Sequence, residues 1–141
     1  PYSTELNAHL VITTCSDISH ARQTALQITK GLGFNDTEAD QVATVVTGLA
    51  AHVLCYVGGG QIQLNTVTRL HQTGIEIIAD DYGLDLSNKV LAVAQELSTA
   101  HRLGCGLSGI RQLMDELIVA STIDQGSHLI ARRWTTASPT L

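Results

Sequence analysis

The chain lacks the features that mark secreted, disulfide-bonded or membrane-spanning proteins. Its three cysteines, Cys15, Cys55 and Cys105, are widely spaced and form no CxxC pair, so the sequence supports neither a disulfide framework nor a zinc knuckle. No run of about eighteen apolar residues occurs, and no basic segment followed by an apolar stretch opens the chain. We therefore expect a cytoplasmic protein with reduced thiols and no contact with a membrane.

Positive charge is also scarce. Lysine and arginine number 8 against 13 aspartates and glutamates, which gives a formal net charge of -5 at pH 7. A nucleic-acid partner would then need a local basic patch. The nearest candidate, Arg132-Arg133 beside Trp134, is short and lies in a segment typical of a strand. We therefore expect no nucleic-acid partner.

What the chain does have is enough apolar sequence for one folded domain. Apolar residues make up 44% of its 141 residues and charged residues only 15%, which is typical of a folded protein rather than a disordered one. This length is sufficient to bury a core without disulfides or a structural metal. Neither an internal repeat nor a linker interrupts the sequence, so we expect a single domain over residues 1–141.

The first half of the chain predicts a strand followed by two helices. Residues 9–14 are short and β-branched, which is typical of a strand. Ser16 or Asp17 offers an N-cap for a helix that ends near Gly31. A second, longer helix is expected over residues 35–57, before three consecutive glycines. Its apolar positions, three and four residues apart, are Val42, Val45, Val46, Leu49, Val53 and Leu54.

The second half of the chain alternates predicted strands and helices. Gly74 is expected to separate two of the strands. Together with the first half, the pattern predicts one mixed sheet with helices on one face, an α+β fold built as a two-layer α/β sandwich. The strands are expected at 61–65, 75–79, 118–123 and 129–134, and the helices at 87–97 and 104–117.

One glycine-rich segment could bind phosphate. Gly104-Cys105-Gly106-Leu107-Ser108-Gly109 matches GxGxxG, but a dinucleotide-binding fold needs a strand directly before it and an acidic strand end about twenty residues later. Residues 98–102 are not strand-like and no such acid follows, so that interpretation fails; without a following GK[ST], a Walker A loop is also excluded. Two interpretations stay open: a helix N-terminus that binds phosphate, or glycines that allow close helix packing and a tight turn.

The order of these elements resembles the GHKL (Bergerat) ATPase fold: a long helix, two strands, an aspartate at a strand end, a glycine loop with its helix, and a closing hairpin. The aspartate is Asp81, and Gly83 follows two residues later. The resemblance implies that Asp81 accepts a hydrogen bond from the adenine amino group, which suits a carboxylate because that amine is a donor. The alternative is that Asp80-Asp81 only ends a strand and begins a turn.

Short motifs distributed along the chain are more specific. They are Ser16-Asp17-Ile18, Gly31-Leu32-Gly33-Phe34, Tyr56-Val57-Gly58-Gly59-Gly60, Leu113-Met114-Asp115-Glu116-Leu117 and Trp134. Together they resemble the RsbT group of bacterial stress-signalling switch kinases. The resemblance implies ATP or ADP with Mg²⁺ as ligand, a STAS-domain protein of a stressosome-like assembly as substrate, and a regulatory phosphatase as second partner. The nucleotide-binding positions that it implies are Asp81, Gly83, Gly104, Cys105, Gly106, Leu107 and Ser127.

The chain departs from this family pattern at two positions of the long helix. The family carries a catalytic glutamate and a magnesium-binding asparagine four residues apart, and the matching residues here are Gly48 and His52. Gly48 has no side chain that could act as a base. His52 could hold a metal or a proton, or it could be a hydrogen-bonded structural residue. A third departure is Asp85, which replaces the second glycine of the Asp-x-Gly-x-Gly pattern that starts at Asp81.

Three functions remain compatible with the sequence. The first is a serine/threonine kinase of altered or impaired activity, because phosphoryl transfer depends on positioning and on charge neutralisation by metal. The second is a catalytically inactive binding module for STAS or phosphatase partners. The third is an anti-sigma factor of the same fold. The identity of the partner and the oligomeric state do not follow from the sequence.

Overall fold

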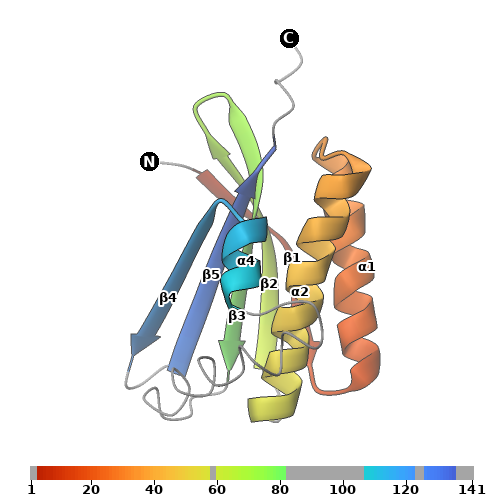
Figure 1. Ribbon diagram of the computed structural model, residues 1–141, viewed down its shortest axis with the longest axis vertical. Helices are drawn as coiled ribbons and strands as arrows, with labels where there is room; N and C mark the ends of the chain where they lie inside the picture. The colour runs from red at the N-terminus through yellow and green to blue at the C-terminus, as the bar shows by residue number, and fades with distance from the viewer. Residues whose placement is uncertain (1–2, 58–59, 82–106, 123–125, 136–141) are drawn as a thin grey trace.

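The computed structural model describes residues 3–57, 60–81, 107–122 and 126–135. Five strands and three helices are found within these residues (Figure 1). In chain order they are β1 Ser3–Ile12, α1 Cys15–Gly31, α2 Asp36–Val57, β2 Gly60–Arg69, β3 Gln72–Asp81, α4 Leu107–Leu113, β4 Glu116–Thr122 and β5 Gly126–Trp134.

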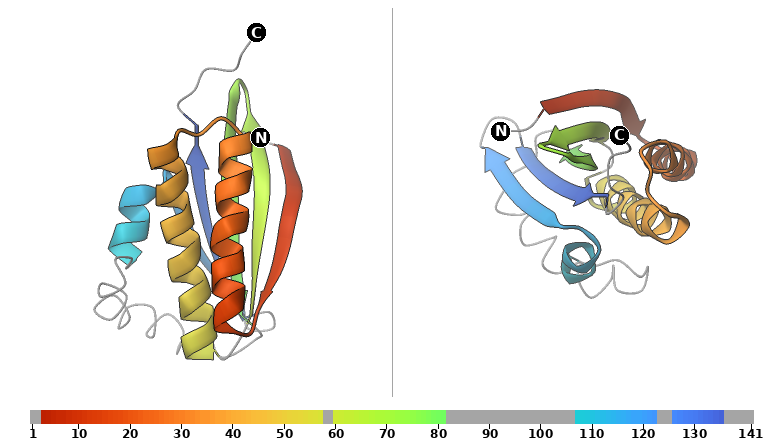
Figure 2. Two further views of the ribbon diagram at one scale, coloured as in Figure 1. Left: turned by 90° about the vertical axis from the view of Figure 1, so that its right-hand side faces the viewer. Right: turned by 90° about the horizontal axis from the view of Figure 1, so that it is seen from above.

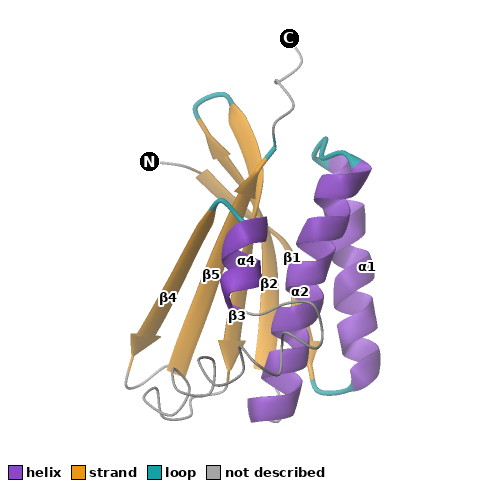
Figure 3. Cartoon of the chain, viewed as in Figure 1, coloured by secondary structure: helices purple, strands orange, loops and turns teal. Residues whose placement is uncertain are grey.

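The strands form one sheet in the order β1-β2-β3-β5-β4. Every neighbouring pair is antiparallel, so the prediction of a mixed sheet is wrong. Hydrophobic patterns along a strand do not show whether its neighbour runs parallel or antiparallel to it. Here β5 turns back from β4 and runs antiparallel to both β4 and β3. The helices α1, α2 and α4 all lie on one side of the sheet (Figures 2 and 3), which confirms an α+β arrangement of a helix layer on a sheet.

Local hydrogen bonds explain where α1 begins. Its N-cap is Thr14, not Ser16 or Asp17 as predicted. The Thr14 hydroxyl accepts a hydrogen bond from the Asp17 amide at 3.3 Å, while the Asp17 carboxylate accepts from the Thr14 amide at 2.9 Å. This is a capping box, in which each side chain satisfies a backbone donor of the other residue. The prediction failed because Thr14, a β-branched residue, suits a strand as well as a cap.

The β2–β3 hairpin is longer than the sequence predicted. Each strand has ten residues, and the turn between them is formed by Leu70 and His71. Gly74 does not separate two strands but lies inside β3, opposite Val67 on one side and Trp134 on the other. A Cβ atom at position 74 would lie 2.6 Å from the Arg133 carbonyl oxygen and 2.9 Å from the Trp134 ring. Gly74 is therefore needed for close approach of β5, not for a break.

The helix predicted over residues 104–117 is shorter in the structure. α4 ends at Leu113, and the next residues enter β4 at Glu116. Ile110 and Met114 are buried in the core as expected, but Leu117 is a strand residue. A short apolar spacing of this kind suits either element. The helix predicted over residues 87–97 lies outside the described residues.

The core lies between the sheet and the helix layer. The apolar stripe predicted for the long helix is confirmed: five of its residues are buried and Leu54 is partly buried. Alternate residues of β3, namely Ile75, Ile77 and Ala79, face these helices. Among the helices that the structure describes, none is both long and apolar enough to cross a membrane.

Candidate functional site

The two substituted positions of the long helix lie away from the core stripe of α2. Gly48 lines a hollow of about 240 Å³ between α1 and α2. The same hollow is lined by Thr44, Thr47 and Ala51 from α2 and by Arg22 from α1. All five residues are half-buried. Gly48 and the residues that share its face of α2 therefore line a cavity.

The polar groups that line this hollow differ in their hydrogen bonds. The Thr44 hydroxyl donates to the Asp40 carbonyl at 2.9 Å, and the Thr47 hydroxyl donates to the Ala43 carbonyl at 2.7 Å. Both hydroxyl protons are thus engaged by the backbone of α2. Arg22 is the charged side chain of the lining. No carboxylate belongs to the lining that the described residues form.

His52 lies one helical turn after Gly48 and is half-buried. Its side chain offers imidazole nitrogens, whereas magnesium prefers oxygen ligands. The described ranges contain no group of three or more His, Cys, Asp and Glu side chains that could hold a metal ion. His52 therefore does not fit magnesium as an asparagine would, and metal binding at His52 stays a prediction.

The backbone brings several of the implied nucleotide-binding positions to one end of the sheet. Asp81 is the last residue of β3 and is paired with Gly60, the first residue of β2. His128 of β5 is paired with Asp80, so the position of Ser127 lies at the same end. α2 also ends here (Figure 1). Positions that are far apart in the sequence are therefore neighbours in the fold.

Asp80 and Asp81 differ in their surroundings along β3. Asp80 alternates with the core residues Ile77 and Ala79, so it belongs to the face of the sheet that no described helix covers. There the Gln61 side chain donates to the Asp80 carboxylate at 3.5 Å. Asp81 as the nucleotide ligand stays a prediction. Of the remaining implied positions, Leu107 opens α4, and Gly83, Gly104, Cys105 and Gly106 lie outside the described residues.

A second polar cluster, which the sequence did not predict, crosses the helix-free face of the sheet. Arg132 donates to the Glu76 carboxylate at 2.7 Å and to the Glu116 carboxylate at 3.1 Å. Asn65 donates to the other Glu76 oxygen at 3.0 Å. The Arg132 and Glu76 side chains are only 10% and 5% exposed. These residues lie opposite one another on neighbouring strands, so strand register joins β2, β3, β5 and β4.

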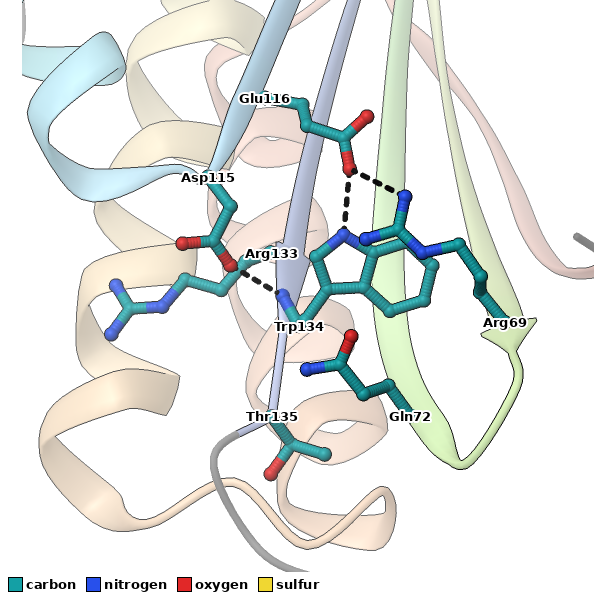
Figure 4. Close-up of a pocket in the computed structure, with 7 residues that line it drawn as sticks. All are labelled: Arg69, Gln72, Asp115, Glu116, Arg133, Trp134 and Thr135. Atoms are coloured by element: carbon teal, nitrogen blue, oxygen red, sulfur yellow. Dashed lines mark hydrogen bonds and ion pairs between the residues drawn. The ribbon is translucent and has the colours of Figure 1, made fainter.

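Trp134 extends this cluster at the end of the sheet remote from Asp81 (Figure 4). Its ring nitrogen donates to Glu116 at 2.7 Å, its backbone amide donates to Asp115 at 2.8 Å, and the Arg69 guanidinium lies 4.5 Å from its ring centroid. These residues line an open depression of about 570 Å³. The hydrogen bond from Trp134 lowers the pKa of Glu116, assisted by Arg132 and opposed by burial.

This cluster explains why two of the family motifs occur together. Asp115 and Glu116 belong to the motif Leu113-Met114-Asp115-Glu116-Leu117, and both bind Trp134 directly. Arg133, on the other face, donates to Gln41 at 2.6 Å and to the Leu113 carbonyl at 2.7 Å. The adjacent arginines are therefore engaged in the fold rather than forming a basic patch. No local sequence signal could have revealed this, because the partners belong to other helices and strands of the fold.

Comparison with known proteins identifies a relative across nearly the whole fold. No protein-family model matches the chain. The chain is similar to the serine/threonine-protein kinase RsbT of Bacillus subtilis (strain 168), with 33% identity over 118 residues. The match covers 84% of this chain and 89% of that kinase. Since the identity exceeds 30% and the match covers more than two thirds of both proteins, the chain belongs to the RsbT-like family of serine/threonine-protein kinases.

Proposed function

We propose that this chain is a regulatory serine/threonine switch kinase. It binds ATP or ADP with Mg²⁺, phosphorylates a serine or threonine of a STAS-domain partner, and engages a regulatory phosphatase in the other state of the switch. The observation that carries the proposal is the 33% identity to a serine/threonine-protein kinase over 89% of that kinase. The nucleotide, the STAS partner and the phosphatase are inferred from the family resemblance.

The geometry supports a nucleotide at the end of the sheet that holds Asp81. The strand register places the positions of Asp81, Gly60 and Ser127 at this end, and the half of α2 with Gly48 and His52 runs toward it. A carboxylate there would accept a hydrogen bond from an adenine amine. Magnesium would then be held largely through nucleotide phosphates, because His52 offers no oxygen ligand.

The residues of α2 support a reduced activity in this proposal. Gly48 provides no carboxylate at the position where the family carries its base, and the hollow beside it contains none from the rest of the described lining. Loss of a general base lowers the rate of a proton-transfer step by roughly 10²–10⁴-fold. This observation also favours the second candidate function, a binding module of the same fold that recognises its partners without transferring phosphate.

Phosphoryl transfer from radiolabelled ATP to a purified STAS-domain protein tests the proposal. We expect slow transfer by the unchanged chain and faster transfer by the double variant Gly48→Glu, His52→Asn. Asp81→Asn should abolish transfer in both backgrounds. Transfer only by the double variant would assign the natural chain to the binding-module function. Absence of transfer by both proteins, with the partner bound, would contradict the kinase proposal.

A further inference from the structure

The hollow between α1 and α2 contains a positive charge that none of the described residues neutralises. Arg22 lines it and is half-buried, yet within the described residues its guanidinium makes no hydrogen bond and no ion pair. Arginine stays protonated in proteins. A partly buried cation gains free energy from an anion placed beside it. The hollow therefore offers a binding position for an anion that the described residues do not supply.

The lining selects among anions. The Thr44 and Thr47 hydroxyls already donate to carbonyls of their own helix, so the guanidinium of Arg22 is the remaining strong donor. The described lining contains this one cation, which matches the single charge of a carboxylate better than the charge of about -2 that a phosphate group carries at pH 7. A carboxylate is planar and binds one guanidinium through two parallel hydrogen bonds. The small residues Gly48 and Ala51 leave room for the carbon that carries it.

We propose that this hollow binds a carboxylate, paired with Arg22 and seated over Gly48. The carboxylate is either a small free acid or the side chain of an aspartate or glutamate in a protein partner. In the proposed kinase, it would occupy the region in which the family places its catalytic glutamate. That second role rests on the proposed function. The binding of the carboxylate does not, because it follows from the hollow and from Arg22.

The proposal is tested first by supplying the carboxylate within the chain. Gly48→Glu places one in the hollow, and Gly48→Gln is the matched control, since both changes remove a helical glycine and add a side chain of similar size. We expect the melting temperature of Gly48→Glu to exceed that of Gly48→Gln by about 3 °C. In the Arg22→Gln background this difference should disappear. Equal melting temperatures of the two variants in the presence of Arg22 would overturn the proposal.

A second measurement uses the unchanged chain and needs neither ATP nor a protein substrate. Sodium acetate is titrated against sodium chloride at equal ionic strength while the Nε–Hε resonance of Arg22 is followed by NMR. Acetate, but not chloride, should shift this resonance in a saturable manner, and Gly48→Glu should abolish the shift. Identical responses to acetate and chloride would overturn the proposal. A failure of the kinase assay would leave this result unaffected.

A third arm of the titration separates the two sources of the carboxylate. Glutamate blocked at both its amino and carboxyl groups presents only a side-chain acid, as a protein partner would. Tighter binding of this probe than of acetate would assign the hollow to an acidic side chain of a partner. Tighter binding of acetate would assign it to a small free acid. Binding of neither probe would contradict the proposal.

Discussion

Glu116 joins Trp134, Arg132 and Arg69 in the polar cluster on the helix-free face of the sheet. It accepts hydrogen bonds from Trp134 and Arg132, and the Arg69 guanidinium lies 3.9 Å away. The pKa of Glu116 therefore falls below its ordinary value of about 4.5. A carboxylate whose pKa is lower in the folded than in the unfolded state stabilises the folded state at every pH above the unfolded-state pKa. This contribution is lost as the pH falls through the folded-state pKa.

The substitution Glu116→Gln tests this dependence. It should lower the free energy of unfolding by about 1 kcal/mol at pH 7, because charge-assisted hydrogen bonds become neutral ones. The difference from the unchanged protein should shrink at a pH below 4.5, as the pH falls through the lowered pKa of Glu116. Urea unfolding at both pH values measures it. A loss of stability that is equal at both pH values would show that the charge of Glu116 is not the cause.

Substitution of Gly74 should also destabilise the protein. A methyl group there would meet the backbone of Arg133 as well as the Trp134 ring, and backbone cannot yield as a flexible side chain does. Gly74→Ala should therefore lower the free energy of unfolding by about 2–3 kcal/mol. Gly31→Ala is the control, since nothing lies within 4 Å of an added Cβ there. It should be neutral or slightly stabilising, as measured by the same denaturant titration.

Among the elements, α1 illustrates how a cap decides where a helix begins. Thr14→Ala removes the hydroxyl that accepts from the Asp17 amide, and it should cost about 1 kcal/mol of unfolding free energy. Ser16→Ala changes the residue that spacing alone suggested as a cap, and it should change stability by less than about 0.5 kcal/mol. Thermal unfolding of the two variants distinguishes them. The reverse order of effects would mean that the helix begins at Ser16.

The elements also show what sequence patterns can and cannot predict. The stripe from Val42 to Leu54 predicted α2 and its buried face correctly, because helix periodicity is a local property. The extent of β2 and β3 was missed because Gly74 reads locally as a break. Its actual role depends on Trp134, which is far away in the chain.

The same distinction holds for the candidate site. That Gly48 shares a helix face with Thr44, Thr47 and Ala51 follows from the sequence alone, because helix spacing is local. That Arg22 of α1 reaches the hollow beside them depends on how α1 and α2 pack together, which spacing along one helix does not encode. The bonds from Trp134 to Asp115 and Glu116 require β4 and β5 to be paired. The sequence therefore predicts which residues share a face, and tertiary packing decides which faces meet.

For the whole molecule, the two ends of the sheet have different chemistry. Asp81 lies at one end, and Trp134 at the other (Figure 1). Trp134 is the single tryptophan of the chain and is only 6% exposed. Its fluorescence should therefore report unfolding but not ligand binding at the Asp81 end.

Titration with ADP and ATP, with and without magnesium, tests this separation. Calorimetry should detect nucleotide binding that requires magnesium and that Asp81→Asn abolishes. Over the same titration the emission maximum of Trp134 should stay constant, whereas urea should move it to longer wavelength. An emission shift on nucleotide binding that Asp81→Asn removes would show that the two ends are coupled.

The strand order has a consequence for how the protein is made. β5 lies between β3 and β4, inside the sheet, although it is the last of the described strands in the chain. During synthesis, β3 therefore cannot pair fully with β5 until residue 134 has left the ribosome. Until then, the backbone donors and acceptors along that edge of β3 are available to other chains. The nascent chain is therefore most prone to aggregation during this interval, and a chaperone would have its greatest effect then.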